Sequence, residues 1–130
     1  HKYLGWNARL DAVHAAILRV KLPHVDSWIA GRRAAAARYD RLIEGAGLHG
    51  FLHRPTVRPY GTHTFNQYVV RVPAGHRDPL VNHLKANHVG AEVYYPVCTH
   101  QQECVTKYGF RTGSYPVSEE AARTVLALPM

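Results

Sequence analysis

Two long helical patterns with a proline between them take up the first third of the chain. In residues 8–22, apolar side chains recur every three or four positions, which is the spacing of an amphipathic helix. A second pattern of this kind covers residues 24–44 and contains an alanine run at 34–37, whose intrinsic helix propensity is high. Pro23 is well placed in the first turn of the second helix, and Gly45 is a typical helix stop. The sequence therefore predicts two consecutive helices.

The rest of the chain alternates between strand and helix patterns. Residues 64–72 are rich in aromatic and β-branched side chains, which favours a strand. The elements expected after it are a helix over 78–87, a strand over 91–95, a helical turn within 102–108, a helix over 118–126 with Ser118 as its N-cap, and a short strand or loop entry over 128–130. Helices followed by strand, helix, strand and helix predict the α/β or α+β fold class.

Composition excludes several classes of protein. Apolar residues make up 46% of the chain and charged residues 19%, which is typical of a globular domain. No apolar run approaches the roughly 20 residues that a membrane span requires, and the N-terminal residues lack the features of a secretory signal. Cys98 and Cys104 are too few to cross-link a domain of this size. We therefore expect a cytoplasmic protein with reduced thiols and no membrane partner.

The net charge of +7 favours anionic partners. The basic residues are dispersed, and no block is longer than the pair Arg32–Arg33, so a small anionic ligand is favoured over nucleic acid. The ten histidines show no spacing typical of a metal site, because Gly50 between His49 and His53 argues against a helix at that point. Neither a metal site nor a nucleic-acid partner is expected.

Polar and aromatic residues at the ends of the expected elements are the candidates for binding. Asn7 stands at the start of the first helix, where free backbone N–H groups favour an anion such as a phosphate, although a plain N-cap is the alternative. Tyr94 and Tyr95 end the second expected strand, and His100 follows shortly. Two tyrosines there can hydrogen-bond a sugar or a diphosphate, but adjacent strand residues face opposite sides, so one of the two can belong to the core. No complete catalytic constellation is visible.

Five ordered motifs cover nearly the whole chain. Residues 5–22 read G-W-N-A-R-L-D-A-V-H-A-A-I-L-R-V-K-L, and residues 93–102 contain Tyr-Tyr-Pro followed by His-x-Gln. The other three motifs lie at 28–39, 63–71 and 115–130. With their spacing, these motifs closely resemble the DegT/StrS family of pyridoxal-phosphate-dependent sugar aminotransferases. The chain departs from the family pattern at His14, where glutamine is usual, and at Tyr94, where many members have histidine.

The resemblance implies the aspartate-aminotransferase-like fold (fold type I), in which a small C-terminal domain follows a large cofactor domain. Residues 1–45 are then expected to be the connecting helices from the large domain and part of the dimer interface. Residues 46–130 are expected to be the small C-terminal α/β domain, truncated at its end. The family's Schiff-base lysine lies upstream in an S-(F/Y)-x-x-x-K context, which none of the four lysines here has. No catalytic residue is therefore expected in this chain, and the chain alone is expected to be inactive.

The resemblance also implies a function: transfer of an amino group, with glutamate as the expected donor, onto a keto sugar nucleotide. The implied cofactor is pyridoxal 5'-phosphate, and the implied partner is a second subunit in a homodimer with shared active sites. Asn7 matches the family asparagine that reaches the cofactor phosphate of the other subunit. Tyr95 matches a tyrosine that contacts the nucleotide sugar, with Tyr94 and His100 expected beside it.

Two alternatives to the aminotransferase remain open at this point. Some members of the same family are sugar dehydratases, and the residue that separates the two reactions lies upstream of the matched motifs. A non-catalytic basic module that binds other proteins or nucleic acid is the second alternative, because the chain carries a net charge of +7.

Overall fold

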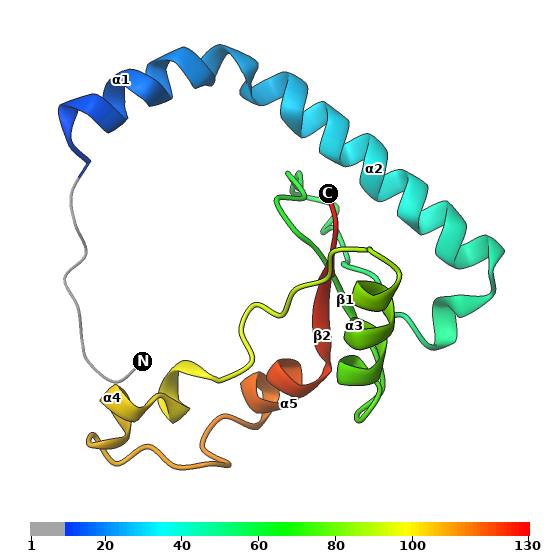
Figure 1. Ribbon diagram of the computed structural model, residues 1–130, viewed down its shortest axis with the longest axis vertical. Helices are drawn as coiled ribbons and strands as arrows, with labels where there is room; N and C mark the ends of the chain where they lie inside the picture. The colour runs from blue at the N-terminus through cyan, green and yellow to red at the C-terminus, as the bar shows by residue number, and fades with distance from the viewer. Residues whose placement is uncertain (1–9) are drawn as a thin grey trace.

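The computed structural model describes residues 10–130, and their first part is an extended helical arm (Figure 1). The arm consists of helix α1 (Ala12–Lys21), the 3-10 turn η1 (Leu22–His24) and helix α2 (Val25–Gly45). Both predicted helices are confirmed, but the first begins later than predicted, because Leu10 and Asp11 are not helical. Asp11 is its N-cap: a carboxylate oxygen accepts the His14 N–H at 2.8 Å, which lowers the pKa of Asp11. The cap expected from the sequence, Asn7, lies outside the described residues.

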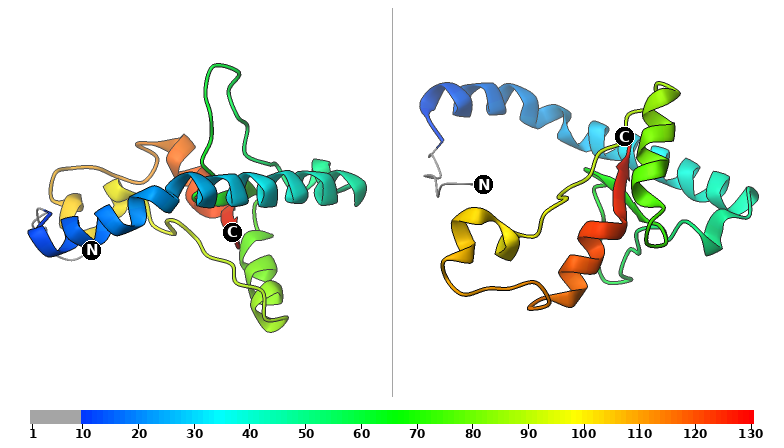
Figure 2. Two further views of the ribbon diagram at one scale, coloured as in Figure 1. Left: turned by 90° about the horizontal axis from the view of Figure 1, so that it is seen from above. Right: turned by 60° about the horizontal axis from the view of Figure 1, so that its bottom comes forward.

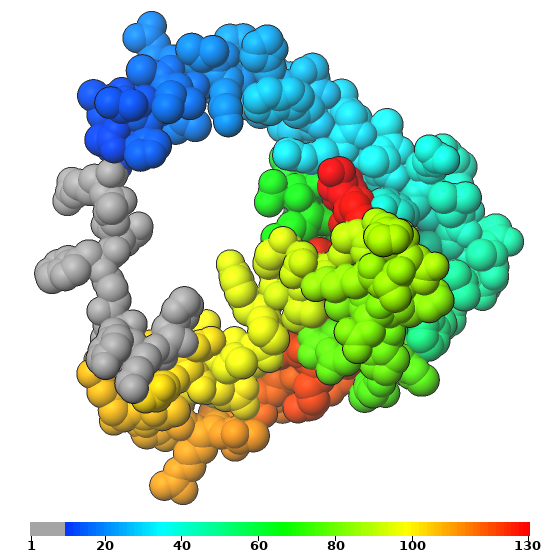
Figure 3. All heavy atoms as spheres, in the orientation of Figure 1, coloured from blue at the N-terminus to red at the C-terminus, as the bar shows by residue number. Residues whose placement is uncertain are grey.

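Helix α1 packs against little of the described chain. None of its residues is buried, and four of its apolar side chains are between 50% and 73% exposed: Val13, Ile17, Leu18 and Val20. Figure 3 shows open space between α1 and the body of the molecule on the side drawn. The apolar face that the sequence predicts is therefore present, and it is accessible to solvent.

Helix α2 joins the arm to the body. Ala36 and Ile43 are two turns apart on the same face of α2, and both are buried. Tyr39 stacks on Tyr68 with ring centroids 5.0 Å apart, and its O–H donates to the carbonyl of Pro129 at 2.9 Å. The second half of α2 is thus fixed to the body by apolar packing and by a hydrogen bond.

The first strand is shorter than predicted. After the 3-10 turn η2 (Leu48–Gly50), the chain contains no helix or strand until strand β1 (Tyr68–Arg71), although His53 forms an isolated bridge with Arg71. Phe65 has a φ of +49° and its N–H donates to a ring nitrogen of His63 at 2.9 Å. That left-handed conformation interrupts the extended backbone, so the strand expected over 64–72 cannot begin at residue 64.

The helix expected over 78–87 is confirmed as α3 (Arg77–Ala86), whereas the strand expected over 91–95 is wrong. In the latter segment only Glu92 pairs with a strand, through two backbone hydrogen bonds of 2.7 and 3.2 Å to Ala127. Ala91 is nevertheless buried, so the apolar pattern reports packing rather than a ladder of hydrogen bonds. Figure 2 shows α3 and the loop before β1 on opposite sides of α2.

The last part of the chain holds two short helical turns, a helix and a strand. These are η3 (Thr99–Gln101), α4 (Glu103–Thr106), α5 (Pro116–Thr124) and β2 (Val125–Leu128). Helix α4 confirms the predicted helical turn. Helix α5 begins earlier than predicted, with Tyr115 as N-cap and Pro116 in its first turn, so Ser118 is not the cap. The chain passes from Thr124 directly into β2.

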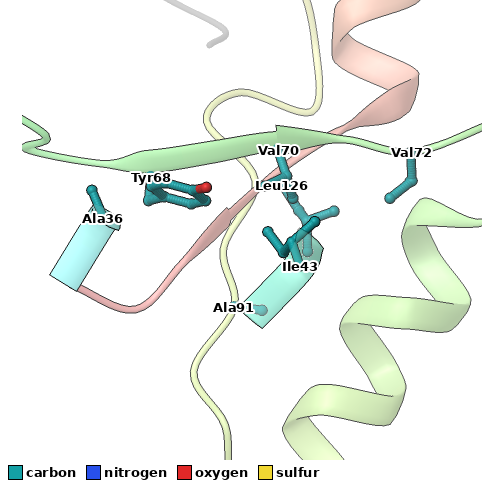
Figure 4. Close-up of a cluster of buried hydrophobic side chains, with 7 residues drawn as sticks. All are labelled: Ala36, Ile43, Tyr68, Val70, Val72, Ala91 and Leu126. Atoms are coloured by element: carbon teal, nitrogen blue, oxygen red, sulfur yellow. The ribbon is translucent and has the colours of Figure 1, made fainter. Parts of the chain in front are cut away.

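The core lies between the two-stranded sheet and α2 (Figure 4). Strands β1 and β2 are antiparallel, and Val70 pairs with Leu126. The buried cluster combines residues of both strands with others from α2 and the segments after β1 and α3: Ala36, Ile43, Tyr68, Val70, Val72, Ala91 and Leu126. The Tyr68 O–H donates to a carboxylate oxygen of Asp40 on α2, and burial, with this bond, raises the pKa of Tyr68. The described residues thus form a mixed α/β body.

Candidate functional site

Three of the four predicted binding residues lie together. Tyr94, Tyr95 and His100 line one open pocket of about 300 Å³, which we call the tyrosine pocket. Its other walls are Val97, Cys98 and Thr99 from the same segment, Ser118, Ala121 and Ala122 from α5, and Val125 from β2. The fourth predicted residue, Asn7, lies outside the described residues.

The two tyrosines stand on a stretch of chain without regular structure. It begins where Glu92 pairs with β2 and ends where η3 begins. Tyr95 is 75% exposed and Tyr94 is about half exposed, so both phenol groups are available to a ligand. Their rings meet edge to face with centroids 6.1 Å apart. Neither tyrosine belongs to the core, which resolves the alternative left open by the sequence.

Tyr94 also lines a second pocket, of about 270 Å³, on the edge of β2. Asn66, Gln67 and Glu92 are among the residues that line that pocket. Tyr94 therefore separates two openings whose walls carry several hydrogen-bonding groups. Phenols, amides and hydroxyls without a dense cluster of charge suit a ligand rich in hydroxyl groups.

His100 differs from the tyrosines because it is buried. His100 is 8% exposed and Glu119 is 6% exposed, and His100 Nε2 lies 2.9 Å from Glu119 Oε1. A carboxylate only accepts, so the imidazole donates from Nε2. The ring of Tyr115 packs on the imidazole with centroids 4.8 Å apart. His100 thus forms the inner wall of the pocket, with one ring nitrogen already committed to Glu119.

Glu119 is the residue of this site that sequence reasoning missed. The sequence places it only in the first turn of a helix, where an acid is favoured by the helix dipole. The structure adds three donors: the His100 ring, the Gly113 N–H at 2.8 Å and the Tyr115 N–H at 3.4 Å. These bonds, that from His100 foremost, hold the pKa of Glu119 below its ordinary value of 4.5 although burial opposes the shift. His100 and Glu119 are 19 positions apart, so no local sequence pattern predicts that they pair.

The depressed pKa of Glu119 predicts how stability depends on pH. A carboxyl group whose pKa is lower in the folded state contributes stability above its unfolded-state pKa, and this contribution is lost as the pH falls through the folded-state pKa. We expect the melting temperature to fall more steeply below pH 4.5 in the wild type than in Glu119→Gln, as measured by circular dichroism from pH 7 to pH 3. Equal slopes would contradict this prediction. Glu120→Gln, which removes the adjacent exposed acid, is the control.

Metal binding and membrane insertion receive no support in the described part of the chain. No group of three or more His, Cys, Asp or Glu side chains between residues 10 and 130 is arranged to hold a metal ion. None of the helices in that range is long and apolar enough to cross a membrane.

Comparison with known proteins decides the family. The model of the DegT/DnrJ/EryC1/StrS aminotransferase family matches residues 1–130. The chain belongs to this family. The resemblance of its five motifs is therefore confirmed.

Named relatives in the DegT/DnrJ/EryC1/StrS family are mostly sugar transaminases. The chain is 40% identical over 128 residues to a dTDP-3-amino-3,4,6-trideoxy-alpha-D-glucose transaminase of Micromonospora megalomicea, covering 97% of this chain and 33% of that protein. It is 42% identical over 130 residues to a protein of Geobacillus stearothermophilus named "Pleiotropic regulatory protein", covering 100% of this chain and 34% of that protein. The chain thus spans about a third of the length of the curated relatives it matches.

Solved structures of DegT/DnrJ/EryC1/StrS members confirm the fold class. The chain superposes on S. venezuelae DesV, determined in complex with a ketimine intermediate, with a TM-score of 0.82 and 35% identity, covering 100% of this chain and 34% of that one. A family member from Brucella abortus gives a TM-score of 0.78 at 28% identity, covering 98% of this chain and 32% of that one. The mixed α/β body is therefore part of the fold type I architecture of these aminotransferases.

Lysine is the residue type that anchors the family's cofactor, and three lysines lie among the described residues. Lys85 pairs with Glu92 at 3.3 Å, and Lys107 lies over the ring of Tyr108 at 5.3 Å from its centroid. Lys21 lies at the end of α1 and is exposed. None of these lysines lines the tyrosine pocket. Among the described residues, no lysine is therefore placed at this pocket to anchor pyridoxal phosphate.

Proposed function

We propose that this chain forms the sugar-binding part of an aminotransferase that moves an amino group onto a keto sugar nucleotide. The observation that carries the proposal is the tyrosine pocket, which brings Tyr94, Tyr95 and His100 together in a chain whose relatives are named as transaminases of dTDP- and UDP-sugars. We expect a cytoplasmic enzyme, with glutamate as the amino donor.

The roles we assign within the tyrosine pocket follow from exposure. Tyr95 presents its phenol to the ligand, and Tyr94 stands between this pocket and the neighbouring one. His100 supports the wall, because its Nε2 is already bonded to Glu119. A phenol at position 94 offers a donor and an acceptor but no positive charge at neutral pH, which favours contact with sugar hydroxyls over contact with a phosphate.

Membership of the family is the ground on which we include pyridoxal phosphate in the proposal. When bound, it supplies the electron sink for transamination, while the protein orients the substrate. We propose that its covalent anchor lies outside this chain, that the active enzyme is a homodimer with shared active sites, and that Asn7 contacts the cofactor phosphate of the other subunit.

Reduction with borohydride tests the position of that anchor. We expect the 130-residue chain, incubated with pyridoxal phosphate and then reduced, to show no stoichiometric label on a single lysine by peptide mass spectrometry. Sparse labelling shared among Lys21, Lys85 and Lys107 fits the expectation. Stoichiometric labelling of one lysine would overturn it. A lysine-anchored aminotransferase treated in parallel is the positive control.

The two alternatives predict different observations. A sugar dehydratase would also bind a nucleotide sugar but would release no keto acid from glutamate when the whole enzyme is assayed. A nucleic-acid-binding module would bind duplex DNA with an affinity that falls steeply as salt increases. Binding of a nucleotide sugar at the tyrosine pocket, without such DNA binding, favours the aminotransferase over the second alternative.

A further inference from the structure

Residues from two stretches of chain, one around His100 and one at 113–115, meet at the carboxylate of Glu119 on α5. His100 comes from the end of the stretch that carries the two tyrosines, and its Nε2 is 2.9 Å from Oε1. Gly113 comes from the loop between α4 and α5, and its N–H lies 2.8 and 3.0 Å from the two carboxylate oxygens. Tyr115 lies directly before α5, and its N–H lies 3.4 Å from Oε1. One buried side chain therefore joins the tyrosine stretch, the loop and the helix.

The tyrosine stretch depends on this junction because no strand ladder holds it. At its start, Glu92 pairs with Ala127 through the backbone. At its end, the bonds from the Gln101 N–H to the Cys98 carbonyl and from the Gln102 N–H to the Thr99 carbonyl are local ones that close η3. There the bond between His100 and Glu119 ties the stretch to α5, and the ring of Tyr115 packs on the imidazole. Tyr94 and Tyr95 therefore lie between two attachments of this stretch: the pairing of Glu92 with Ala127 and the bond of His100 to Glu119.

The same geometry argues against a chemical role for Glu119. Both of its oxygens accept hydrogen bonds from the protein, and the residue is only 6% exposed. A general acid or base needs an oxygen that reaches the substrate, and Glu119 does not line the tyrosine pocket. A buried carboxylate that accepts several hydrogen bonds from the protein is instead suited to holding other groups in place.

We propose that Glu119 is the positioning residue of the tyrosine pocket, which fixes Tyr94 and Tyr95 toward a nucleotide sugar by holding His100. The proposal rests on the function proposed above only for the identity of the ligand. The placement of the tyrosine stretch by Glu119 stands independently, and it can be measured without any ligand.

Glu120 provides a matched control for Glu119. It is the adjacent residue on the same helix, carries the same charge and also forms an ion pair, with Arg123 at 2.8 Å. That pair lies on the surface, so replacing Glu120 removes an acid from α5 without touching the junction.

The first experiment compares Glu119→Gln with Glu120→Gln in the chain without ligand, by ¹H–¹⁵N spectroscopy. In Glu119→Gln we expect the backbone N–H of Gly113 and the ring N–H of His100 to exchange with solvent at least about tenfold faster. We also expect the resonances of Tyr94 and Tyr95 to shift, while amides of β1 and β2 keep their protection. Glu120→Gln should leave all of these signals unchanged. Unchanged signals of the tyrosines in Glu119→Gln would overturn the proposal.

A rescue experiment separates positioning from general loss of structure. In His100→Gln the side-chain amide can still donate to Glu119, whereas in His100→Ala nothing can. We expect the resonances of the two tyrosines to stay near their wild-type positions in His100→Gln and to move in His100→Ala. If both variants behave alike while the sheet amides remain protected, the bond to Glu119 does not set the position of the tyrosines.

The second experiment measures affinity for UDP-N-acetylglucosamine and for dTDP-glucose by titration. We expect Glu119→Gln to weaken binding roughly tenfold to a hundredfold, because a small misplacement of binding groups is costly, and Glu120→Gln to bind like the wild type. If the wild type binds neither probe, the proposed function fails while the exchange data still decide the role of Glu119. If the wild type binds and Glu119→Gln binds equally well, the positioning role is wrong.

Discussion

Replacing Leu126 with alanine is expected to lower the free energy of unfolding by about 2–5 kcal/mol. Leu126 is fully buried, pairs with Val70 across the sheet and packs in the cluster that unites the sheet with α2. Removing its side chain loses the transfer free energy of the apolar atoms and leaves a cavity that a two-stranded sheet bounded by α2 cannot close completely. Urea denaturation followed by circular dichroism measures the change.

Leu42→Ala is the matched control for Leu126→Ala. Leu42 lies on α2 beside the buried Ile43, but its own side chain is exposed. Its truncation is therefore expected to change the free energy of unfolding by less than about 0.5 kcal/mol. A similar loss for both variants would show that the cluster around Leu126 is not the core of this body.

Replacing Tyr95 with alanine is expected to weaken the binding of UDP-N-acetylglucosamine about tenfold, which corresponds to about 1.4 kcal/mol. The variant loses a phenol that donates and accepts hydrogen bonds and an aromatic face for the sugar ring, each of which contributes on the order of 1 kcal/mol. Tyr95 is 75% exposed, so folding should be unaffected. Isothermal titration calorimetry measures the affinity.

Two further variants sharpen the test of Tyr95. Tyr95→Phe keeps the ring, so it separates the contribution of the hydroxyl from that of the aromatic face. Tyr60→Ala removes an even more exposed tyrosine that does not line the tyrosine pocket, and it should leave the affinity unchanged. Wild-type affinity in Tyr95→Ala would remove Tyr95 from the proposed binding site.

The helices of the arm could be predicted from sequence because their signals are local. Apolar periodicity, the alanine run and the stop at Gly45 all act within a few turns of one helix, and α2 follows them to within one residue. The start of α1 is harder to predict from sequence, because Asn7 and Asp11 are both good N-caps and the sequence alone does not rank them. The structure uses Asp11.

The errors in the second half have different physical causes. Ala91 is buried without belonging to a strand, so the apolar pattern of that segment reports packing rather than strand pairing. Ser118 has the side chain of an N-cap, but Pro116 lies in the first turn of a helix that begins earlier and has no side-chain cap.

The candidate site likewise has a part that the sequence predicts and a part that it does not. Tyr94, Tyr95 and His100 lie close together in sequence, so the motif predicts that they group in one pocket. The motif does not predict that Glu119 is the partner of His100, because the two residues meet only through the folding of the segment between them. Periodicity and spacing rules describe neighbours along the chain and carry no information on such a closure.

The contrast between α1 and α2 has a consequence for how the chain melts. A helix of ten residues is marginally stable in water on its own, and α1 shares no buried residue with the sheet, whereas α2 contributes Ala36 and Ile43 to it. The cooperative unit of this chain therefore ends within α2, and helical order in α1 is lost at lower temperature than the remainder, in a gradual transition rather than a sharp one.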